Sequence, residues 1–482
     1  MSGNANQELI QAVADINSAD DVVDLLVVLL KICRLHAEEV LAAGQDLTKR
    51  AQMRQEAGRA QQAASAFTSR VLSAATKQLV INGLQQATDF AVAARAWALG
   101  IDLAMGPGTK VYSQLCAKPP NVIRILKEGD PYPTPSVDLS SMYGANVGFS
   151  RKPRRNAATA FDRVGGLALW PSASSQPLKV IYDTVAGAYL DRALVQRDTV
   201  DILAVVPNQD FWSEFNVTMQ PDQTFFDVQP KHTADQDTTL RAALQLASDH
   251  DVDIVVTPEL SDTKNTVALI KAALTQNGGG RPRVVIAGGS HIVTGTGERR
   301  NRMSTIYADL NLPEVTHDKI GEFVFTTKDR QTKRLVEWDE GIHRSTELRI
   351  HAGITWSMIT LICADLLDDT VVDAVADLCP RLVIVPSMSA KTGDYEMSMG
   401  AVIRKSQALV MVVNGPPEWT DPPDPLQPLA KPPLRAIAPV VIVGMPLAKA
   451  WITTLSMPAP PPSAGPPYTV LFRSDQCQVS FV

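Results

Sequence analysis

Three side chains that could act together in catalysis stand at or beyond the ends of apolar, strand-like runs. Glu259 and Cys363 each follow such a run, and Lys319 lies in a loop after another. A thiolate is a good nucleophile, a carboxylate can take and return its proton, and a fixed ammonium can stabilise an oxyanion. Because sites in open α/β sheets form at the carboxyl ends of strands, we expect the three groups to share one crevice. These residue types favour cleavage of an amide by acylation of the cysteine and hydrolysis of the product.

Cys363 is the least certain of the three when it is considered alone. The apolar run 354–362 precedes it, and the acidic, loop-like segment 365–369 follows at once. A cysteine at a strand end is usually a packing residue of the core, which is the competing interpretation. A nucleophile needs a sharp turn out of the strand so that it can face a cleft. Lys319 favours the second interpretation, since a nearby cation lowers the pKa of a thiol.

Alternating strand and helix patterns begin near residue 180 and must position these residues. This alternation predicts an α/β sandwich in which the strands are buried under helices. The strands are expected at 200–206, 254–256, 284–287, 303–309, 347–351, 354–362, 382–385 and 409–413, and the helices at 237–249, 263–275, 371–378 and 395–407.

Residues 1–106 have a helical pattern and contain no evident chemistry. Ser18 is the expected N-cap of a helix whose first turn contains Asp20 and Asp21, and these charges favour the helix dipole. We predict an all-α N-terminal domain that acts as a scaffold, mediates homo-oligomerisation or binds a protein partner. Its later helices are expected at 47–80 and 84–99.

The rest of the chain is expected to divide into a linker and one large domain. Proline and glycine recur over 107–179, which we interpret as a linker with local order. The α/β domain would then cover 180–482. Its last part, 416–482, is rich in proline and is expected to be an irregular tail around two short β-like runs, 440–443 and 468–472, since proline interrupts regular strand ladders.

The segments around the three residues resemble motifs of the carbon–nitrogen hydrolase (nitrilase/amidase) superfamily. Residues 253–260 (DIVVTPEL) are similar to its glutamate motif, 317–320 (HDKI) to its lysine motif and 361–365 (LICAD) to its cysteine motif. The resemblance covers about residues 198–415 and does not include the N-terminal 175 residues. Further matches in the family's order are 288–290, Asn301, 383–387 and 412–415.

The resemblance implies a role for each residue. Cys363 would be the nucleophile that forms a thioester. Glu259 would be the general base that takes its proton and later serves the leaving amine and the attacking water. Lys319 would stabilise the tetrahedral intermediate, helped by a backbone N–H just after the cysteine, and Ala364 and Ser387 are expected to bind substrate. The family fold is an α-β-β-α sandwich that pairs into dimers, so a homo-oligomer is expected, and the chemistry requires no metal or organic cofactor.

The family also carries a second glutamate between its lysine and its cysteine. Glu322, Glu337 and Glu340 are the candidates here, and we favour Glu337 in the segment 334–338 (RLVEW). For each of them the alternative is a charge in a solvated loop.

The leading hypothesis is a cysteine-dependent, amidase-like hydrolase of a non-peptide carbon–nitrogen bond in a small-molecule amide or nitrile. Amide, nitrile and carbamoyl substrates stay open, as does acyl transfer to an acceptor other than water. Ala364 stands where an aromatic residue often follows the family's cysteine, and 366–369 lacks the arginine and proline common there. These departures, the extra 175 N-terminal residues and the irregular tail motivate a second hypothesis. It is a catalytically inactive, nitrilase-like sensor or interaction protein whose helical N-terminus binds a partner.

Composition argues against a nucleic-acid partner, a metal site and a membrane span. The 482 residues are 45% hydrophobic with a net charge of −6 and no dominant basic stripe, which argues against a nucleic-acid partner. The five cysteines are scattered and lack metal spacing, which favours reduced thiols in the cytoplasm and no metal site. The apolar run 22–35 contains Asp24 and Lys31 and is too short and too charged to span a membrane.

Overall fold

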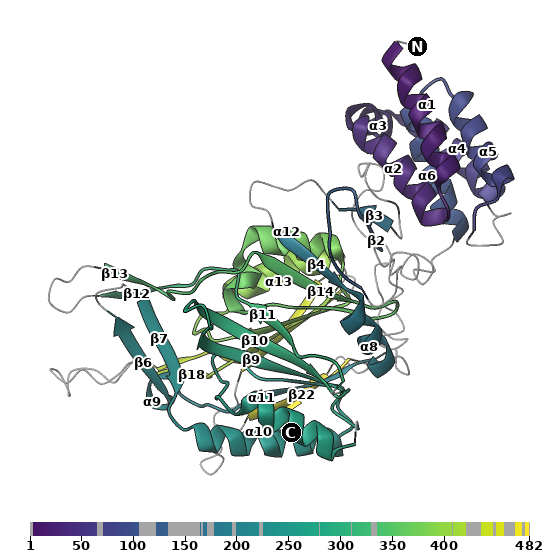
Figure 1. Ribbon diagram of the computed structural model, residues 1–482. Coiled ribbons are helices and arrows are strands. Elements are labelled where there is room, and N and C mark those ends of the chain that lie inside the picture. Colours follow the sequence, from purple (N-terminus) through teal and green to yellow (C-terminus); the bar gives the residue numbers. More distant parts are fainter. Residues whose placement is uncertain are drawn as a thin grey trace. The chain divides into compact units, whose positions relative to one another are not determined.

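The protein is described by a computed structural model, and its elements are labelled in Figure 1. The residues fall into two units, Met1–Asp138 with Arg151–Pro177 and Leu139–Ser150 with Leu178–Val482. The predicted linker, 107–179, and the domain limits on either side of it stay predictions, because most of that segment lies outside the described residues. The described residues are 3–64, 71–105, 122–133, 164, 167–170, 178–194, 199–220, 225–278, 280–309, 311–328, 335–406, 408–420, 435–446, 450–456, 468–474 and 478–481.

The first unit is all-α over its helices α1 to α6, as the sequence predicts. Helix α2 is its centre, because Leu25, Leu26, Leu29 and Leu30 are fully buried in one hydrophobic cluster. A short antiparallel pair of strands, β2 (Pro131–Pro133) and β3 (Leu167–Leu169), belongs to the same unit. The helices are α1 (Gly3–Ser18), α2 (Val22–Leu35), α3 (Ala37–Gln45), α4 (Leu47–Ala64), α5 (Ala74–Gln85) and α6 (Phe90–Met105).

The predicted N-cap of α2 is wrong. Asp21 is the N-cap, and its carboxylate accepts hydrogen bonds from the backbone N–H groups of Val23 and Asp24. The Asp24 side chain accepts the N–H of Asp21 in return, which completes a capping box. Ser18 is instead the last residue of α1.

The later helices also begin and end elsewhere than predicted. In place of one helix over 47–80 the structure has α4 and α5, and the Ser73 hydroxyl caps α5 by accepting the N–H of Thr76. The helix expected at 84–99 is α6, which begins after Asp89, whose carboxylate accepts the N–H of Val92. Side-chain caps of this kind end one helix and start the next within a continuous polar pattern.

The second unit has a mixed α/β fold built on two large sheets. One sheet contains β4-β14-β15-β16-β17-β20-β21 in that order, and the other is β11-β10-β9-β8-β5-β22-β23. Their central strands are parallel and fully buried, which explains their continuous apolar sequences. The strands are β4 (Lys179–Asp183), β5 (Asp201–Val206), β8 (Ile254–Val256), β9 (Val284–Val293), β10 (Arg299–Tyr307), β11 (Val315–Asp318), β14 (Glu347–Ala352), β15 (Ser357–Thr360), β16 (Leu382–Ser387), β17 (Leu409–Asn414), β20 (Pro439–Pro446), β21 (Ala450–Ser456), β22 (Tyr468–Arg473) and β23 (Gln478–Phe481).

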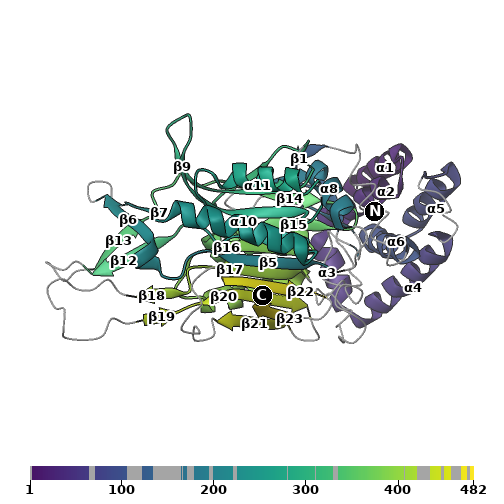
Figure 2. The ribbon, with the colours of Figure 1, turned by 90° about the horizontal axis from the view of Figure 1, so that it is seen from below.

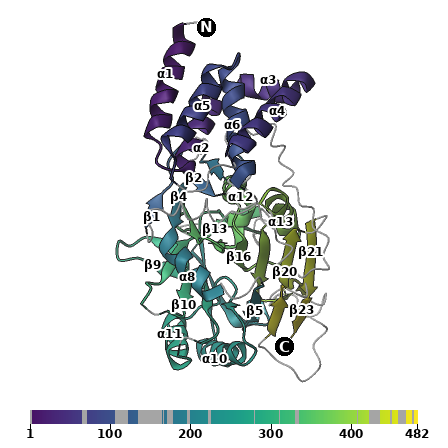
Figure 3. The same ribbon diagram turned by 90° about the vertical axis from the view of Figure 1, so that its right-hand side faces the viewer.

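Helices cover these sheets. Helices α10 (Thr233–Asp249) and α11 (Thr266–Gln276) lie side by side (Figure 2), and they bury Leu244 and Ile270 against Val255 of β8 in one cluster. Helices α12 (Asp369–Leu378) and α13 (Gly393–Ser406) contact each other, and α13 contacts β17, β20 and β21 (Figure 3). Helix α8 (Thr184–Leu194) packs on β14.

Smaller elements complete the second unit. A sheet of order β12-β13-β7-β6 is formed by β6 (Phe215–Gln220), β7 (Phe225–Pro230), β12 (Val324–Lys328) and β13 (Leu335–Asp339). The short helix α9 (Phe211–Glu214) contacts β18 (Glu418–Thr420), which pairs with β19 (Arg435–Ile437).

The predicted tail, 416–482, is more regular than expected in its described residues. The two expected β-like runs lie in β20 and β22, and the chain also forms β18, β19, β21 and β23. Strands β20 and β21 extend the first sheet beyond β17, and β22 and β23 extend the second beyond β5. Proline does not prevent this, because Pro439 and Pro446 stand at the two ends of β20.

Within the parts of the chain that the structure describes, no helix is long and apolar enough to cross a membrane.

Candidate active site

Cys363 stands at a sharp turn after a strand, as a nucleophile would require. Strand β15 ends at Thr360, and a 3₁₀ helix, η2 (Cys363–Leu367), begins at the cysteine itself. The backbone of Cys363 has a φ of 44°, in the left-handed region that side chains other than glycine rarely adopt. Such strain persists only where the surrounding structure imposes it, and it is concentrated at functional sites.

Asp365 ties the cysteine turn to the loop that carries the lysine. One of its carboxylate oxygens accepts the backbone N–H groups of Ile320 (2.7 Å) and Gly321 (2.6 Å). The other accepts the N–H of Ile362 (2.9 Å) and lies 2.8 Å from His317 Nε2. The fully buried carboxylate therefore fixes the two loops to each other.

Gly321 lets the two loops approach closely. A Cβ atom at this position would lie 2.5 Å from the carbonyl carbon and oxygen of Ala364, which is closer than real contacts allow. The lysine motif and the cysteine motif are therefore in backbone contact, although they are far apart in sequence.

Glu259 lies just beyond β8, and its carboxylate is buried with three donors. Oε1 accepts from Lys319 Nζ and from Asn301 Nδ2, each at 2.8 Å, and Oε2 accepts the backbone N–H of Met388 at 3.1 Å. Because only 2% of its surface is exposed, these hydrogen bonds replace the solvation that the charge loses on folding.

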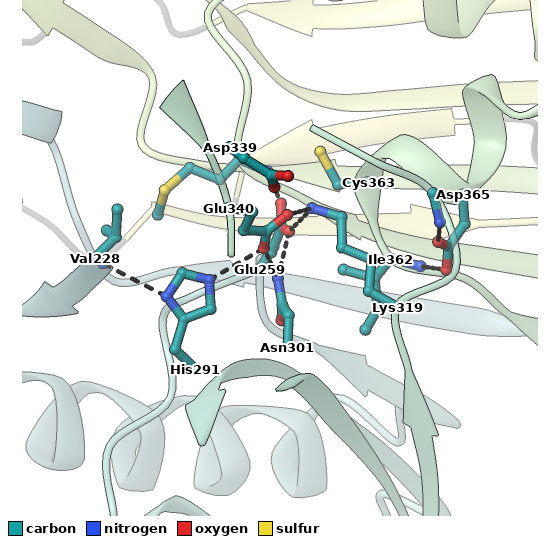
Figure 4. A network of polar contacts seen from close by, with 12 residues as sticks. Val228, Glu259, His291, Asn301, Lys319, Asp339, Glu340, Ile362, Cys363 and Asp365 are labelled. Carbon is teal, nitrogen blue, oxygen red and sulfur yellow. Dashed lines mark hydrogen bonds and ion pairs between the residues drawn. The ribbon is translucent and has the colours of Figure 1, made fainter. Parts of the chain in front are cut away.

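Lys319 lies between two carboxylates (Figure 4). Its ammonium donates to Glu259 and to Glu340 Oε2, each at 2.8 Å. Asn301 joins the same two residues, because its amide donates to Glu340 Oε1 at 2.6 Å as well as to Glu259. Behind them, His291 Nε2 lies 3.0 Å from Glu340 Oε1. The four groups form one buried network around the ammonium.

The network favours the charged forms of Lys319, Glu340 and His291. Burial alone would lower the pKa of Lys319, but Glu259 and Glu340 raise it well above the usual value. Burial would raise the pKa of Glu340, but Lys319 and His291 lower it to about 2. Burial would lower the pKa of His291, but hydrogen bonds to Asp227 and Glu340 raise it. Lys319 is therefore a fixed cation at neutral pH.

The sulfur of Cys363 has two hydroxyl groups beside it. Tyr395, from α13, places its hydroxyl oxygen 2.9 Å from the sulfur, and Ser387 Oγ lies 3.6 Å from the sulfur. The single hydroxyl hydrogen of Ser387 is donated to the Tyr395 hydroxyl at 2.9 Å. Burial, and then the charge of Glu259, raise the pKa of the Cys363 thiol to about 12, while Lys319 and the two hydroxyls act against them. The resting sulfur is a neutral thiol.

The predicted crevice exists as a cavity of about 430 Å³. Glu259, Lys319 and Cys363 all line it, although they come from different loops and from strands of both large sheets. Ala364, predicted to bind substrate, also lines the cavity, whereas Ser387 contacts the cysteine sulfur and the Tyr395 hydroxyl.

The choice of Glu337 as the second glutamate needs revision. Glu340 is the candidate that contacts Lys319. It is the first residue after β13, and its side chain lines the cavity. Glu322 is half exposed and pairs with Arg344 at 3.2 Å. Glu337 lies within β13, and its side chain is outside the described residues.

Sequence reasoning did not assign roles to Tyr395, His291 or Asp365. Tyr395 meets the sulfur only through the tertiary fold, because helix α13, which carries it, packs against η2, which carries Cys363. Asp365 could have been found, because an acidic residue directly after a turn can accept backbone N–H groups. Among the described residues, no group of three or more His, Cys, Asp or Glu side chains is arranged to hold a metal ion.

No protein-family model matches the chain, and no curated protein sequence matches it. Solved structures with similar folds include the glutamine-dependent NAD⁺ synthetase from Acinetobacter baumannii bound to ADP. That match has 13% identity and a TM-score of 0.36, and it covers 58% of this chain but 47% of the synthetase, so the chain spans about half of that protein.

Two smaller proteins are matched over nearly their whole length. An amidase mutant from Nesterenkonia sp. AN1, with acrylamide added at its active-site cysteine, has 12% identity and a TM-score of 0.33, covering 54% of this chain and 94% of the amidase. A CN-hydrolase superfamily protein from Xanthomonas campestris, with an arsenic adduct in its active site, has 14% identity and a TM-score of 0.35, covering 57% and 90%. Similarity at this level assigns no activity or substrate to this chain.

Proposed function

We propose that the protein is a cysteine-dependent hydrolase of a non-peptide carbon–nitrogen bond, of the amidase type. The observation that supports this most is the meeting of Glu259, Lys319 and Cys363 at one cavity. A buried acid–base group, a fixed cation and a thiol at a strained turn are the parts that amide cleavage through a thioester needs. The motifs around the three residues resemble those of carbon–nitrogen hydrolases in the same order.

In the first step the thiol attacks the carbonyl carbon of the amide. The thiol proton passes to the Glu259 carboxylate as the carbon–sulfur bond forms, and the carbonyl oxygen becomes an oxyanion. When the carbon–nitrogen bond breaks, protonated Glu259 returns the proton to the leaving nitrogen, and ammonia or an amine departs. The product on the enzyme is a thioester of Cys363.

In the second step water hydrolyses the thioester. Glu259 takes a proton from the water, the new carbon–oxygen bond forms, and the carbon–sulfur bond breaks with return of the proton to sulfur. The carboxylic acid leaves and the thiol is restored. The high pKa of the resting thiol suits this scheme, because the proton moves only as the nucleophile attacks.

Lys319 is placed to stabilise the oxyanion in both steps. Two of its three N–H donors bind Glu259 and Glu340, which orients the ammonium and leaves a third donor toward the cavity. The backbone N–H of Ala364 would be the second donor. Removing one donor of such an oxyanion site costs about 3–4 kcal/mol, or roughly 10²–10³ in rate.

The proposal also covers the features that the family resemblance implies. The α-β-β-α order of layers is supported by α10 and α11 on one large sheet and by α12 and α13 beside the other. Homo-oligomerisation, a cytoplasmic location and partner binding through residues 1–106 belong to the proposal as well.

The test is ammonia release from a panel of amides by the wild type and by Cys363→Ala. The variant should lose turnover, and intact-mass analysis of the wild type should show an acyl adduct on Cys363 during turnover. Cys379→Ala is the matched control, because Cys379 is also a buried free cysteine with a positive φ, 49°, but does not line the cavity. Turnover that persists in Cys363→Ala would contradict the proposal.

One observation favours the alternative of a non-catalytic ligand-binding protein. The Cys363 side chain is buried, and burial and the charge of Glu259 raise the pKa of its thiol to about 12, so the sulfur is not a thiolate at rest. In that case the cavity would bind a small amide without forming an adduct. Incubation with an amide and a nitrile probe, followed by intact-mass analysis, separates the two, because only the hydrolase forms a covalent adduct on Cys363.

A further inference from the structure

The cavity extends from the catalytic groups along a wall of aromatic side chains. These come from four separate segments: helix α9, strand β7, the loop before β12, and strand β18. Aromatic rings from so many segments do not meet by local sequence pattern, so the tertiary fold assembles this wall. The rings are those of Phe211, Trp212, Phe226, Phe323 and Trp419.

The rings are already packed against one another. Phe211 and Trp419 are stacked, with their ring centroids 4.3 Å apart and their planes inclined by 16°. Phe226 and Phe323 meet edge to face at 6.1 Å. The indole N–H of Trp419 donates to the carbonyl of Pro416 at 2.9 Å, which fixes the orientation of that ring. The wall is therefore formed before any ligand enters.

The wall begins directly at the catalytic groups. The Lys319 ammonium lies 5.7 Å from the centre of the Phe323 ring, within the range of a cation–π contact. Leu260, next to the catalytic Glu259, packs in the same apolar cluster as Phe211 and Phe226. A substrate carbonyl at Cys363 would thus have its substituent against the aromatic rings.

The aromatic wall contains no charged side chain, and the buried charges of the cavity are paired with one another. Glu259, Glu340 and Lys319 pair with one another. Of the described lining residues, the remaining Asp, Glu, Lys and Arg are Lys391 and Asp394, and both have exposed side chains. A charged substituent would lose its hydration against the rings, and the buried charges of the cavity, Glu259, Glu340 and Lys319, are already paired, which makes its binding unfavourable.

We infer that the substrate is an uncharged amide whose acyl group carries an aromatic ring, held against the wall that the Phe211–Trp419 and Phe226–Phe323 pairs form. The inference rests on the proposed function and specifies its substrate class. The reaction is the one given above: the aryl-substituted acyl group is transferred to Cys363 with loss of ammonia, and water then releases the aryl-substituted carboxylic acid. A small amide such as acetamide would leave the aromatic wall uncovered.

The test compares four primary amides with the wild type: acetamide, hexanamide, 3-phenylpropanamide and 3-(4-carboxyphenyl)propanamide. We expect kcat/KM for 3-phenylpropanamide to exceed that for acetamide by about 100-fold, with hexanamide between them and the carboxylate analogue close to acetamide. Equal use of acetamide and 3-phenylpropanamide, or preference for the charged analogue, would overturn the inference and leave the proposed hydrolase intact.

Variants of the wall test the same point. Trp419→Phe and Phe226→Leu should each lower the ratio of kcat/KM for 3-phenylpropanamide to that for acetamide, by about 5- to 10-fold. Met397→Ala is the control, because Met397 is an exposed apolar residue of α13 outside the cavity, and the ratio should stay unchanged. An unchanged ratio in both wall variants would count against the inference.

Binding without turnover separates the two proposals. Calorimetry with Cys363→Ala should show 3-phenylpropanamide binding at least ~10-fold more tightly than hexanamide. Tight binding to this variant without turnover by the wild type would refute the hydrolase and keep the aromatic-ligand site. Absence of this preference would refute the aromatic site, whatever the wild type hydrolyses.

Discussion

The hydroxyl oxygen of Tyr395 lies 2.9 Å from the sulfur of Cys363, and the same hydroxyl accepts a hydrogen bond from Ser387. Because Ser387 is the donor in the second contact, the phenolic hydrogen of Tyr395 is available to the sulfur. A donated hydrogen bond stabilises a thiolate more than a thiol. Tyr395 therefore opposes the burial that keeps the thiol neutral, and it does so from a helix that the sequence did not connect with the cysteine.

Tyr395→Phe should raise the pKa of the Cys363 thiol further. A hydrogen bond to a charged group contributes about 1.5–3 kcal/mol, which corresponds to roughly one to two pKa units. The rate of alkylation by iodoacetamide at fixed pH, followed by peptide mass, should fall about tenfold or more. Tyr189→Phe is the matched control, because Tyr189 does not line the cavity. Alkylation that is unchanged or faster in Tyr395→Phe would contradict the role.

Glu259→Gln should separate the two roles of Glu259, as the base that takes the thiol proton and as a charge that raises the thiol pKa. The variant loses the base that takes the thiol proton, so amide turnover should fall by at least ~10²-fold. After burial, the charge of Glu259 is the next cause of the high thiol pKa, so its loss should lower that pKa and speed alkylation of Cys363. Mass spectrometry over time would measure both, with buried Cys379 as the internal control. Slower alkylation would contradict the electrostatic part.

Glu340→Gln should destabilise the fold. A glutamine cannot accept from Lys319 on one side and from both Asn301 and His291 on the other, so the buried ammonium loses a partner. We expect the free energy of unfolding in urea to fall by about 3–5 kcal/mol. Glu322→Gln is the control, since its exposed pair with Arg344 contributes at most ~1 kcal/mol. Equal effects would contradict the prediction.

The same variant should change the pH dependence of stability. The pKa of Glu340 is about 2 in the folded protein, below its usual value of 4.5, so the folded state binds fewer protons than the unfolded state between these values. The stability from this group is complete above pH 4.5 and is lost as the pH falls toward 2. Glu340→Gln should therefore lose less stability than the wild type over this interval, as measured by denaturation at several pH values.

Asp365→Asn should loosen the link between the cysteine and lysine loops. Its carboxylate accepts three backbone N–H groups, and an amide nitrogen in place of one oxygen would face one or two of these donors. Leaving such buried donors unpaired costs about 1–3 kcal/mol. Asp368→Asn is the matched control, because Asp368 caps α12 and asparagine caps a helix equally well. Amide turnover and thermal unfolding should change only in Asp365→Asn.

The strand ends could be predicted from sequence because the information is local. Buried parallel strands are continuous apolar runs, and the polar residue that ends each run is where a side chain can enter a crevice. This places Glu259 and Cys363 without any knowledge of the sheet order. The competing interpretation of Cys363 as a packing residue was not resolved by its own surroundings, since its sulfur is indeed buried.

The second glutamate, Tyr395 and the sheet positions of the tail strands could not be predicted, because they depend on tertiary contacts between segments that are distant in sequence. Glu337 and Glu340 are three residues apart, and the choice between them depends on where strand β13 ends. The sequence around Tyr395 has the pattern of an ordinary helix, and nothing in it reveals that this helix packs on the turn that carries Cys363. In the tail, the β-like runs 440–443 and 468–472 indicate β20 and β22, but the neighbouring prolines concealed that these strands extend the two large sheets.

The pairing of β22 with β5 has a consequence for how the protein folds. Tyr468 lies opposite Val206 in the antiparallel register, and β5 in turn is the neighbour of β8, the strand that leads to Glu259. Contacts between such distant parts of the chain are slow to form, because closing the long loop between them costs conformational entropy before any contact stabilises the chain. On the ribosome, the edge of β5 therefore stays unpaired until residues near 468 have been synthesised. During that time it is an exposed apolar strand edge, at which aggregation competes with folding.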